Sequence, residues 1–442
     1  MKNSQASIIV KNPDALRVVA SAARISTQQG TALELYGNSR GDERDLRLIG
    51  KVLSSGHKSV VEHQTFSVAF NNVSVLVEQY VIESRLASFT VKSRRYVDFT
   101  EAGYVVPEGL SASAREQYEK AMSARFSDYE RLLELGIPRE DARFVLPYCL
   151  RSNFYMTLNA RELIGLICGM LYGRGKGYPE IRALGAQLKA QFDACYPGII
   201  DREADRYGEC ASAPLPQTFR AGECREGNVR LVEAPDSTRR LLEMAGSFSG
   251  RFEGGEAAFA SRLHRMLTDA RPRELELAVY TFLIERVSLA CVTHFTRHRM
   301  LSIMIPPVAQ ALSTGDHVLP QTVQDNAMAL EMYENAFRAQ TAAAGRLQAQ
   351  GMAVEDLSYF ALSGHQVDLV LTLNLRELVH FLRLRTCRRA QWEIREIAWK
   401  MLALLRAREP EIFDRMGPSC VYGPCPEGRM SCGKPYRVDL QR

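Results

Sequence analysis

No stretch of this 442-residue chain approaches the roughly 18 uninterrupted apolar residues that a membrane-spanning helix requires. The chain starts with the polar segment Met1-Lys-Asn-Ser-Gln5 and has no apolar region behind it, so it does not resemble a secretory signal. The net charge of +5 is too small to indicate binding of DNA or RNA. We therefore expect a cytoplasmic protein that associates with neither membranes nor nucleic acids.

The ten cysteines contain no Cys-x-x-Cys pair, the spacing most typical of a zinc site. Three of them, Cys420, Cys425 and Cys432, lie in a Gly/Pro-rich tail over residues 417–442. Because no histidine lies nearby, the pattern favours a mobile tail with reducible thiols over a metal site. We expect no bound metal ion, and the sequence leaves the role of these thiols open.

An internal repeat dominates the sequence. Arg85 and Ser88 correspond to Arg299 and Ser302, since both residues move by the same 214 positions. Matching segments begin each half, at residues 10–14 and 232–236, and end it, at residues 157–163 and 372–378. The sequence therefore predicts two tandem units, 1–227 and 228–442, each of ordinary domain size.

Hydrophobic periodicity predicts helices and strands in each unit. Residues 43–55 carry apolar side chains at helical spacing, and residues 65–70 alternate as a half-buried strand does. A largely apolar helix is expected over 73–86, and an amphipathic helix over 116–135. The predicted fold class is α+β, with two tandem domains that each pack a mixed sheet against long helices.

The two copies of the repeated motif have diverged in opposite ways. Only the first copy contains Ser93-Arg94-Arg95-Tyr96, and only the second contains Arg297-His298-Arg299. Two guanidinium groups and an imidazole offer many donors to phosphate groups. Cations at the end of an apolar helix also have a structural explanation, because the helix dipole favours them there. Both explanations stay open at this point.

A second group of charged residues lies on a predicted helix near the C-terminus. Arg376 and His380 are one turn apart beside an apolar face, which a solvated surface also explains. Arg385 lies about half a revolution from Arg376, so it serves another surface unless the helix bends.

These segments together resemble the flavin-dependent thymidylate synthases. The resemblance rests on the following segments: His57-Lys-Ser59, Arg297-His298-Arg299, Ser93-Arg94-Arg95-Tyr96, Asn374-Leu-Arg376, and Arg385 with Gln391-Trp-Glu-Ile394. It covers nearly the whole chain as two tandem family units. In members with one unit the motif is one uninterrupted stretch, whereas here it is split between two copies.

The resemblance implies binding of dUMP and roles for individual residues. The contacts to the nucleotide match Ser93, Arg95, Tyr96, Arg143, His294, Arg297 and Arg385. Arg385 matches the arginine beside the uracil, where it would stabilise negative charge on the ring as the catalytic residue. The phosphate contacts all fall in the first unit.

The resemblance also implies an FAD cofactor, with NADPH and methylenetetrahydrofolate as co-substrates. The flavin contacts match His57, Ser59, Arg297, His298, Arg299, Asn374, Arg376 and His380. In this family the methylene group of the folate passes to C5 of dUMP to give dTMP, without an enzyme nucleophile. The cofactor carries the redox chemistry while the protein positions it.

Each unit lacks family residues that the other unit retains. Met170 stands in the first unit where the second has Arg385, and Ser358 stands in the second where the first has Arg143. Because the family assembles its sites between subunits of a tetramer, we expect a homodimer of tandem chains, a pseudo-tetramer, with one composite site per chain. The sequence leaves open whether the halves of one chain or of two chains form that site.

Two departures from the family pattern keep other functions open. His294 stands where the family usually has glutamine, and Val91 where it has an acidic or amide residue. A related C5 modification of another pyrimidine nucleotide, such as UMP, is therefore the second hypothesis. The third is a non-catalytic flavin- or nucleotide-binding protein, although random decay should have struck both copies of each motif alike.

Overall fold

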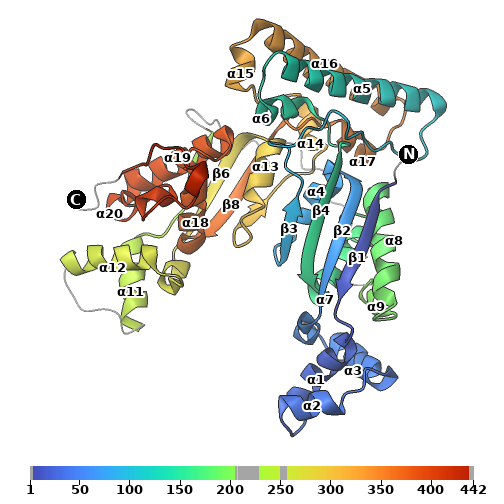
Figure 1. Cartoon of the computed structure of the whole chain (residues 1–442), viewed down its shortest axis with the longest axis vertical. Coiled ribbons are helices and arrows are strands. Elements are labelled where there is room, and N and C mark those ends of the chain that lie inside the picture. The colour runs from blue at the N-terminus through green and yellow to red at the C-terminus, as the bar shows by residue number, and fades with distance from the viewer. Residues whose placement is uncertain (1–2, 205–206, 208–227, 249–255, 438–442) are drawn as a thin grey trace. The chain divides into compact units, whose positions relative to one another are not determined.

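A computed structural model gives the placement of residues 3–204, 207, 228–248 and 256–437 (Figure 1). The chain divides into two compact units. Unit 1 comprises the described residues of Met1–Gln217, Leu312–Gly315 and Leu319–Ser363, and unit 2 comprises those of Thr218–Ala311, Asp316–Val318 and Gly364–Arg442. A segment of the second repeat therefore packs with the first repeat. The predicted boundary between residues 227 and 228 adjoins residues outside the described part and stays a prediction.

Each unit contains a four-stranded antiparallel sheet with the same strand order. Unit 1 has β1 (Gln5–Lys11), β2 (Thr65–Ser74), β3 (Ala87–Val91) and β4 (Arg151–Asn159) in the order β1-β2-β4-β3. Unit 2 has β5 (Val229–Glu233), β6 (Val279–Ser288), β7 (Ser302–Met304) and β8 (Gln366–Asn374) in the order β5-β6-β8-β7. The predicted α+β class with two tandem domains is confirmed. Every strand pair in these sheets is antiparallel, where the sequence predicted a mixed sheet.

Helices surround both sheets. The helices of unit 1 are α1 (Ala15–Ile25), α2 (Ala32–Asn38), α3 (Glu43–Ser54), η1 (Lys58–His63), α4 (Val75–Ile82), α5 (Ala112–Glu134), α6 (Arg139–Ala142), η2 (Arg143–Val145), α7 (Ala160–Leu171), α8 (Pro179–Asp193), α9 (Ile199–Glu203), α15 (Gln321–Gln324), α16 (Ala327–Ala349), α17 (Val354–Leu357) and η4 (Ser358–Phe360). Those of unit 2 are α11 (Thr238–Phe248), α12 (Glu256–Thr268), η3 (Arg273–Leu277), α13 (Leu289–Phe295), α18 (Leu375–Arg385), α19 (Trp392–Arg408), α20 (Pro410–Phe413), η5 (Ser419–Val421) and η6 (Gly428–Met430), while α14 (Gln310–Thr314) joins segments of both units. Among the described residues, no helix combines the length and apolar character needed to cross a membrane.

The helix predicted over residues 73–86 is shorter than expected. Strand β2 continues to Ser74, and α4 occupies only Val75–Ile82. The Ser74 hydroxyl accepts the backbone N–H of Val77 at 3.1 Å, so this serine caps the helix at its N-terminus. The apolar run therefore contains the end of a strand and a helix, which hydrophobicity alone does not separate.

Both sheets bend at the same position. Asn72 and Arg286 have positive φ angles of 53° and 55°, which are uncommon for residues other than glycine. The backbone N–H of Asn72 donates to Asn153 Oδ1 at 2.9 Å, and that of Arg286 donates to Asp368 Oδ1 at 2.8 Å. The strand register shifts at both places, as in a β-bulge. The same bulge thus turns the chain from β2 into α4 and from β6 into α13.

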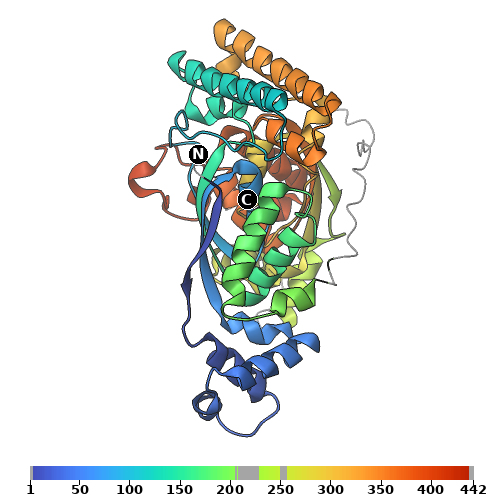
Figure 2. The ribbon, with the colours of Figure 1, turned by 90° about the vertical axis from the view of Figure 1, so that its right-hand side faces the viewer.

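Helices α7 and α8 lie against one face of the unit 1 sheet (Figure 2). Phe70 and Phe154 stack within the core, with ring centroids 4.6 Å apart. Ile167, Leu184 and Leu188 are fully buried in the same cluster. Burial of such side chains is the main favourable contribution to folding, at roughly 25 cal/mol per Å² of apolar surface.

Within unit 1 the two repeats make a reciprocal backbone contact. The Tyr148 N–H donates to Ala361 O at 2.8 Å, and the Ser363 N–H donates to Leu146 O at 2.9 Å. Both partners are related by the same shift of 215 positions (146 to 361 and 148 to 363), so the contact has the symmetry of an interface between identical subunits. This antiparallel bridge lies directly after η2 and after η4.

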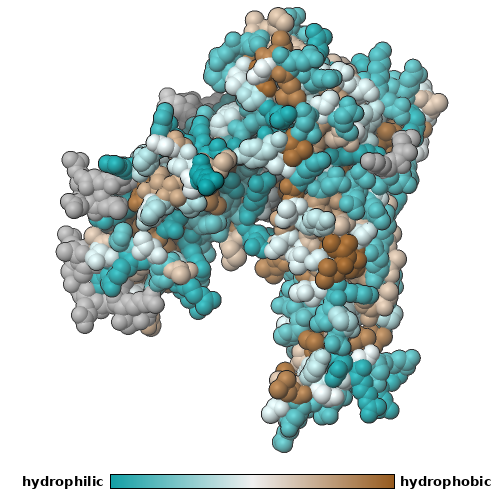
Figure 3. Space-filling view, in the orientation of Figure 1, coloured by the Kyte–Doolittle hydropathy of each residue, from teal (hydrophilic) through white to brown (hydrophobic). Residues whose placement is uncertain are grey.

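The long helices α5 and α16, one from each repeat, also pack together in unit 1. Arg125 donates to the Ala336 carbonyl oxygen at 2.5 Å, and Gln340 donates to the Met122 sulfur at 3.8 Å. Hydrophilic residues dominate the visible outer surface of this helix pair (Figure 3). The helices therefore bury their contact surfaces against each other and expose polar side chains.

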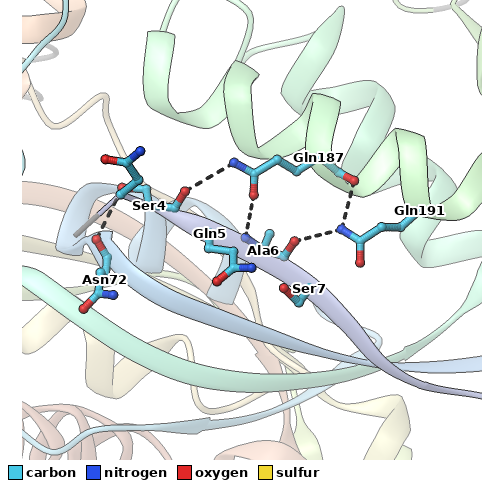
Figure 4. Close-up of a pocket in the computed structure, with 8 residues that line it drawn as sticks. Ser4, Gln5, Ala6, Ser7, Asn72, Gln187 and Gln191 are labelled. Carbon is cyan, nitrogen blue, oxygen red and sulfur yellow. Dashed lines mark hydrogen bonds between the residues drawn. The ribbon is translucent and has the colours of Figure 1, made fainter. Parts of the chain in front are cut away.

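The free edge of β1 is covered by two glutamine side chains of α8 (Figure 4). Gln187 accepts the Ala6 N–H at 2.9 Å, and Gln191 accepts the Ile8 N–H at 2.8 Å. Their amide groups donate to Ser4 O at 3.2 Å and to Ala6 O at 2.9 Å. The glutamines thus pair with an edge strand as a further strand would, which removes a site for aggregation. The shallow pocket here contains none of the predicted site residues.

The described part of the C-terminal tail packs against α18 and α19, although the sequence predicted a mobile tail. The Arg383 guanidinium lies 4.0 Å from the Tyr422 ring centroid, and the rings of Trp399 and Tyr436 are 5.1 Å apart. The Tyr436 N–H donates to Cys420 Sγ at 3.3 Å. Aromatic side chains therefore hold residues 417–437 in place, and the described cysteines are free thiols.

Replacing Gln187 and Gln191 by leucine should expose the outer edge of β1. We expect amide hydrogens of Ala6 and Ile8 to exchange about fivefold faster for each lost hydrogen bond, since one bond contributes about 1 kcal/mol. The inward-facing amides of Gln5 and Ser7 should change less, because they face β2. Residue-resolved hydrogen exchange measures both, and equal acceleration of all four amides would contradict a role limited to the edge.

Candidate functional site

The predicted phosphate contacts gather around Glu140 in unit 1. Arg95 lies in the loop after β3, and its Nε donates to the Glu140 carboxylate. Arg143 begins η2, and its Nε donates to the carbonyl oxygen of Glu140 at 3.0 Å. The Ser93 hydroxyl accepts the backbone N–H of Arg95 at 3.3 Å. The tertiary structure therefore brings together two separate stretches of sequence, residues 93–95 and residues 140–143.

Arg94 anchors the loop that carries Ser93 and Arg95. Its Nη1 donates to both carboxylate oxygens of Glu78, at 3.0 and 2.8 Å, and both side chains are buried. The Ser152 hydroxyl also donates to Glu78. A buried ion pair with these additional bonds is structural, so Arg94 positions its neighbours.

Tyr96 and Arg143 occupy contrasting environments. Tyr96 is 62% exposed, and the Arg95 guanidinium lies 5.3 Å from its ring centroid. Arg143 is only 3% exposed. A buried guanidinium interacts more strongly with an anion than an exposed one, because less water screens its charge.

The predicted flavin contacts of unit 2 begin where α13 ends. Arg297 and Arg299 are exposed, whereas His298 between them is buried. Asn374 is the N-cap of α18, and its Oδ1 accepts the Glu377 N–H at 2.9 Å. This capping role explains why an asparagine stands here even without a ligand.

Arg376 and His380 follow on the first two turns of α18. Arg376 Nη1 pairs with Glu276 Oε1 at 2.5 Å in a partly exposed ion pair. His380 is exposed, and its ring centroid lies 5.5 Å from that of His298. Exposed basic side chains are therefore found both directly after α13 and on α18.

A chain of hydrogen bonds connects α18 with the end of α13. Glu377 Oε1 lies 2.9 Å from His298 Nδ1, and Arg385 Nε donates to His298 Nε2 at 2.9 Å. Arg385 Nη2 also donates to the carbonyl oxygen of His294 at 3.1 Å. Because Nε2 accepts from a guanidinium, His298 is neutral and Nδ1 is the protonated nitrogen that donates to Glu377.

The environment of His298 favours this neutral state. Burial, followed by the positive charges of Arg385, His380 and Arg297, lowers the pKa of His298 from 6.5 to about 2. Burial likewise raises the pKa of Glu377 above its usual value. The contact between His298 and Glu377 is therefore a hydrogen bond to a neutral imidazole rather than an ion pair.

Among the described residues, His298, Glu377 and His380 form one group whose ligand atoms lie within 4.8 Å of one another. Two imidazoles and one carboxylate can together hold a divalent ion. Here, however, both nitrogens of His298 already have partners, and one partner is the cation Arg385. The group is better described as the hydrogen-bonded support of Arg385.

Other predicted residues lie at defined places in the two units. His294 is buried within α13. His57 precedes η1 and Ser59 lies within it, and both are exposed. Lys58 between them pairs with Glu203 at 2.5 Å, which holds η1 against α9. His57 and Ser59 belong to unit 1, whereas the other predicted flavin contacts belong to unit 2.

The position in the first repeat that corresponds to Arg385 is part of the core. Met170 is fully buried, and Glu83, which corresponds to Arg297, pairs with Arg174 at 2.5 Å. The Arg174 guanidinium lies 4.3 Å from the Tyr80 ring centroid. Burial raises the pKa of Tyr80 to about 12. In the first repeat, the space that corresponds to the surroundings of Arg385 is therefore filled by Met170 and the Glu83–Arg174 ion pair.

The second repeat contributes to the same region of unit 1. Ser358, which corresponds to Arg143, forms a hydrogen bond with the Tyr178 hydroxyl. The neighbouring Tyr359 donates to Glu180 at 2.7 Å. Unit 1 thus brings together Met170, Glu83 and Ser358, which are the residues that replace the arginines of the predicted site.

Two residues of this arrangement were missed by the sequence analysis. Glu140 lies three positions before Arg143, so one helical turn places it beside that residue. Glu377 lies three positions after Asn374, at the spacing of a helix cap. Spacing was the available signal in both cases, but it did not reveal the partners Arg95 and His298.

A family model described as "Thymidylate synthase complementing protein" matches the chain twice, over residues 7–198 and 230–411. The two matches follow the two repeats and together cover most of the chain. The protein is accordingly a duplicated α+β enzyme of the methyl-transferring class. It belongs to the flavin-dependent thymidylate synthase family, as a tandem duplication of the family unit.

Proteins of known function that are similar to this chain align with it over about the length of one repeat. The flavin-dependent thymidylate synthase of Geobacter sulfurreducens is 36% identical over 179 residues, which are 40% of this chain and 77% of that protein. That of Saccharolobus solfataricus is 35% identical over 189 residues, 42% of this chain and 72% of that protein. A solved UMP/dUMP methylase, PolB from Streptomyces cacaoi, is 23% identical with a TM-score of 0.39 and covers 48% of this chain and 99% of that chain.

The lowered pKa of His298 predicts a specific dependence of stability on pH. Below about pH 6.5 the unfolded state binds a proton at this histidine that the folded state does not. The free energy of unfolding should therefore fall with decreasing pH, by about 1.4 kcal/mol per unit from this group. His298→Gln should flatten the loss of thermal stability between pH 6 and pH 4, while His264→Gln, at an exposed position, should retain the wild-type slope. Equal slopes for all three proteins would contradict a neutral, buried His298.

Proposed function

We propose that this protein methylates dUMP at C5 to form dTMP, with methylenetetrahydrofolate as the one-carbon donor and NADPH as the reductant. The proposed site is composite, with the phosphate set from the first repeat and the flavin and uracil set from the second. The observation that supports this most is the sorting of the arginines. Arg95 and Arg143 of the phosphate set occur only in the first repeat, and Arg297 and Arg385 of the flavin and uracil set occur only in the second, although the predicted flavin contacts His57 and Ser59 lie in the first repeat. The opposite combination in unit 1 is occupied by Met170 and the Glu83–Arg174 ion pair.

The donor set of unit 2 fits an FAD cofactor. Arg297, Arg299 and His380 are exposed on neighbouring elements, which suits the anionic diphosphate of such a cofactor. Arg376 lies on the same helix, one turn before His380. Bound flavin would supply the hydride and one-carbon transfer chemistry of the family, while these residues bind and orient it.

Arg385 is the proposed catalytic residue. Its Nε and Nη2 atoms are held by His298 and by the His294 carbonyl, so the plane of the guanidinium is defined before substrate binds. A preorganised cation stabilises charge developing on the uracil ring without reorganisation during the reaction. The buried side chain of His294 occupies the position that lies beside the pyrimidine base in the family.

In the proposed phosphate site, the nucleotide replaces an internal carboxylate. Arg95 is paired with Glu140, and Arg143 is anchored to the backbone of the same residue. A phosphate carries more charge than a carboxylate and accepts bidentate bonds from arginine, so it can take over the interaction with Arg95. Ser93 then acts as a binding residue rather than as a nucleophile.

The proposed assembly is a homodimer of tandem chains, equivalent to a tetramer of single family units. The reciprocal bridge of unit 1 supports it, because Tyr148 with Ala361 and Ser363 with Leu146 form a contact of subunit type within one chain.

The proposed reaction is tested by tritium release from C5-labelled dUMP. We expect purified protein with an FAD absorption spectrum to release tritium when NADPH and methylenetetrahydrofolate are present. A parallel assay with C5-labelled UMP identifies the nucleotide, and release from UMP alone would favour the related modification. Flavin binding without release from either nucleotide would overturn catalysis and leave a binding protein.

Substitutions distinguish the composite site from its reverse. Arg385→Ala should lower kcat by about 10²- to 10³-fold, the cost of losing one preorganised donor. Arg95→Ala should mainly raise the KM for the nucleotide. Pro307 stands in the second repeat where the first has Ser93. Met170→Leu and Pro307→Ala should retain turnover, and leucine is chosen because Met170 is fully buried. Comparable loss in all four variants would contradict the assignment. Mixing the Arg385→Ala and Arg95→Ala variants at a low nucleotide concentration should restore activity only if the site lies between chains.

The number of nucleotide sites follows from the same assignment. We expect isothermal titration with dUMP to give one site per tandem chain in the presence of FAD. Two sites per chain would be incompatible with a degenerate Met170 position. The Arg95→Ala variant is the control, because it should weaken the site without creating another.

A further inference from the structure

We propose that Glu377 is a positioning residue, which holds His298 in one tautomer so that His298 Nε2 can fix the guanidinium of Arg385. This inference rests on the proposed function of Arg385. It assigns His298 primarily to the support of Arg385, whereas the family resemblance assigns it to the flavin.

The geometry requires a defined tautomer. Arg385 Nε can only donate, so His298 Nε2 at 2.9 Å must carry a lone pair. The proton of the neutral ring is then on Nδ1, where Glu377 Oε1 accepts it at 2.9 Å. Without this acceptor, a protonated Nε2 would place two donors against each other and release Arg385.

The surroundings leave this contact little freedom. His298 is 3% exposed and Glu377 is 8% exposed, so neither finds an equivalent partner in bulk water. The His298 ring also packs against Phe381 with centroids 5.0 Å apart. An N–H left without an acceptor in such a place is unfavourable enough to change the tautomer or the orientation of the ring.

Two acceptors separated by one turn determine the orientation of Arg385. The His294 carbonyl binds Nη2 at 3.1 Å, and the His298 ring binds Nε at 2.9 Å. Together they define the guanidinium plane, while either contact alone would allow rotation. The position of His298 is in turn set by Glu377, since its other ring nitrogen contacts that carboxylate.

The first repeat supplies a matched control. Glu162 follows the N-cap Asn159 at the same spacing as Glu377 follows Asn374. The positions of His298 and Arg385 are Ser84 and Met170 in that repeat. Glu162 therefore has the same helical setting without a histidine and an arginine to position.

The first experiment measures the tautomer without using activity. Ring nitrogen NMR of histidine-labelled protein, with His298 assigned through His298→Gln, should show protonation at Nδ1 and none at Nε2 at neutral pH. Glu377→Ala should give a mixture of tautomers, and Glu377→Gln, whose amide oxygen accepts the same bond, should restore Nδ1 protonation. Nε2 protonation in the wild type, or an unchanged ring in Glu377→Ala, would overturn the proposal.

The second experiment measures turnover by tritium release. Glu377→Ala should lower kcat roughly 10- to 100-fold, the usual effect of removing a residue that orients a site ligand through another. The KM for dUMP should change less, Glu377→Gln should recover most of kcat, and Glu162→Ala should match the wild type. A loss in Glu377→Ala without recovery in Glu377→Gln would contradict positioning by hydrogen bonding.

The two experiments separate this inference from the proposed function. Absence of tritium release by the wild type, with the predicted tautomer present, would refute the function and leave the structural contact intact. Release by the wild type with unaltered kcat in Glu377→Ala would retain the function and refute the positioning role. Thermal unfolding of each variant identifies losses that come from misfolding.

Discussion

The reciprocal pair of backbone hydrogen bonds in unit 1 is the constraint on which the organisation of the chain depends. Tyr148 pairs with Ala361, and Ser363 pairs with Leu146, so equivalent segments of the two repeats face each other. These segments follow η2 and η4, which begin with Arg143 and Ser358. A contact with the reciprocal symmetry of an interface between identical subunits is thereby built into one chain, in which the two repeats differ in sequence.

The sequence difference between the repeats has a different physical consequence in each of them. In the first repeat, the position that corresponds to Arg385 is apolar, and Met170 contributes to the core there. In the second, the same position is occupied by Arg385, whose charge is supported by His298 and Glu377. A partly buried cation needs such hydrogen bonds, whereas a methionine needs only packing. With Met170 at this position, the first repeat has no cation for a histidine to support, and Ser84 stands where the second repeat has His298.

Much of the fold and the identity of the candidate residues followed from local patterns. The helix α3 and the start of β2 agree with hydrophobic periodicity, and the repeat predicted two domains of the same class, which share one strand order. The length of α4 did not follow, because Ser74 ends the strand through a capping bond within a continuous apolar run. The tail was predicted to be mobile from its Gly/Pro-rich composition, which does not reveal its contacts with Arg383 and Trp399, residues distant in sequence.

The sequence by itself determined that the chain is a duplication and which repeat retains each set of residues, because these properties are carried by residue identity and spacing. Only the tertiary structure decided how those residues are held. It brought Arg95 and Arg143 to Glu140, and it placed His298 between Glu377 and Arg385. Hydrogen bonds depend on distance and direction between atoms far apart in the chain, and burial depends on all surrounding elements together. For this reason the neutral protonation state of His298 and the burial of Met170 in the core became evident only in the folded protein.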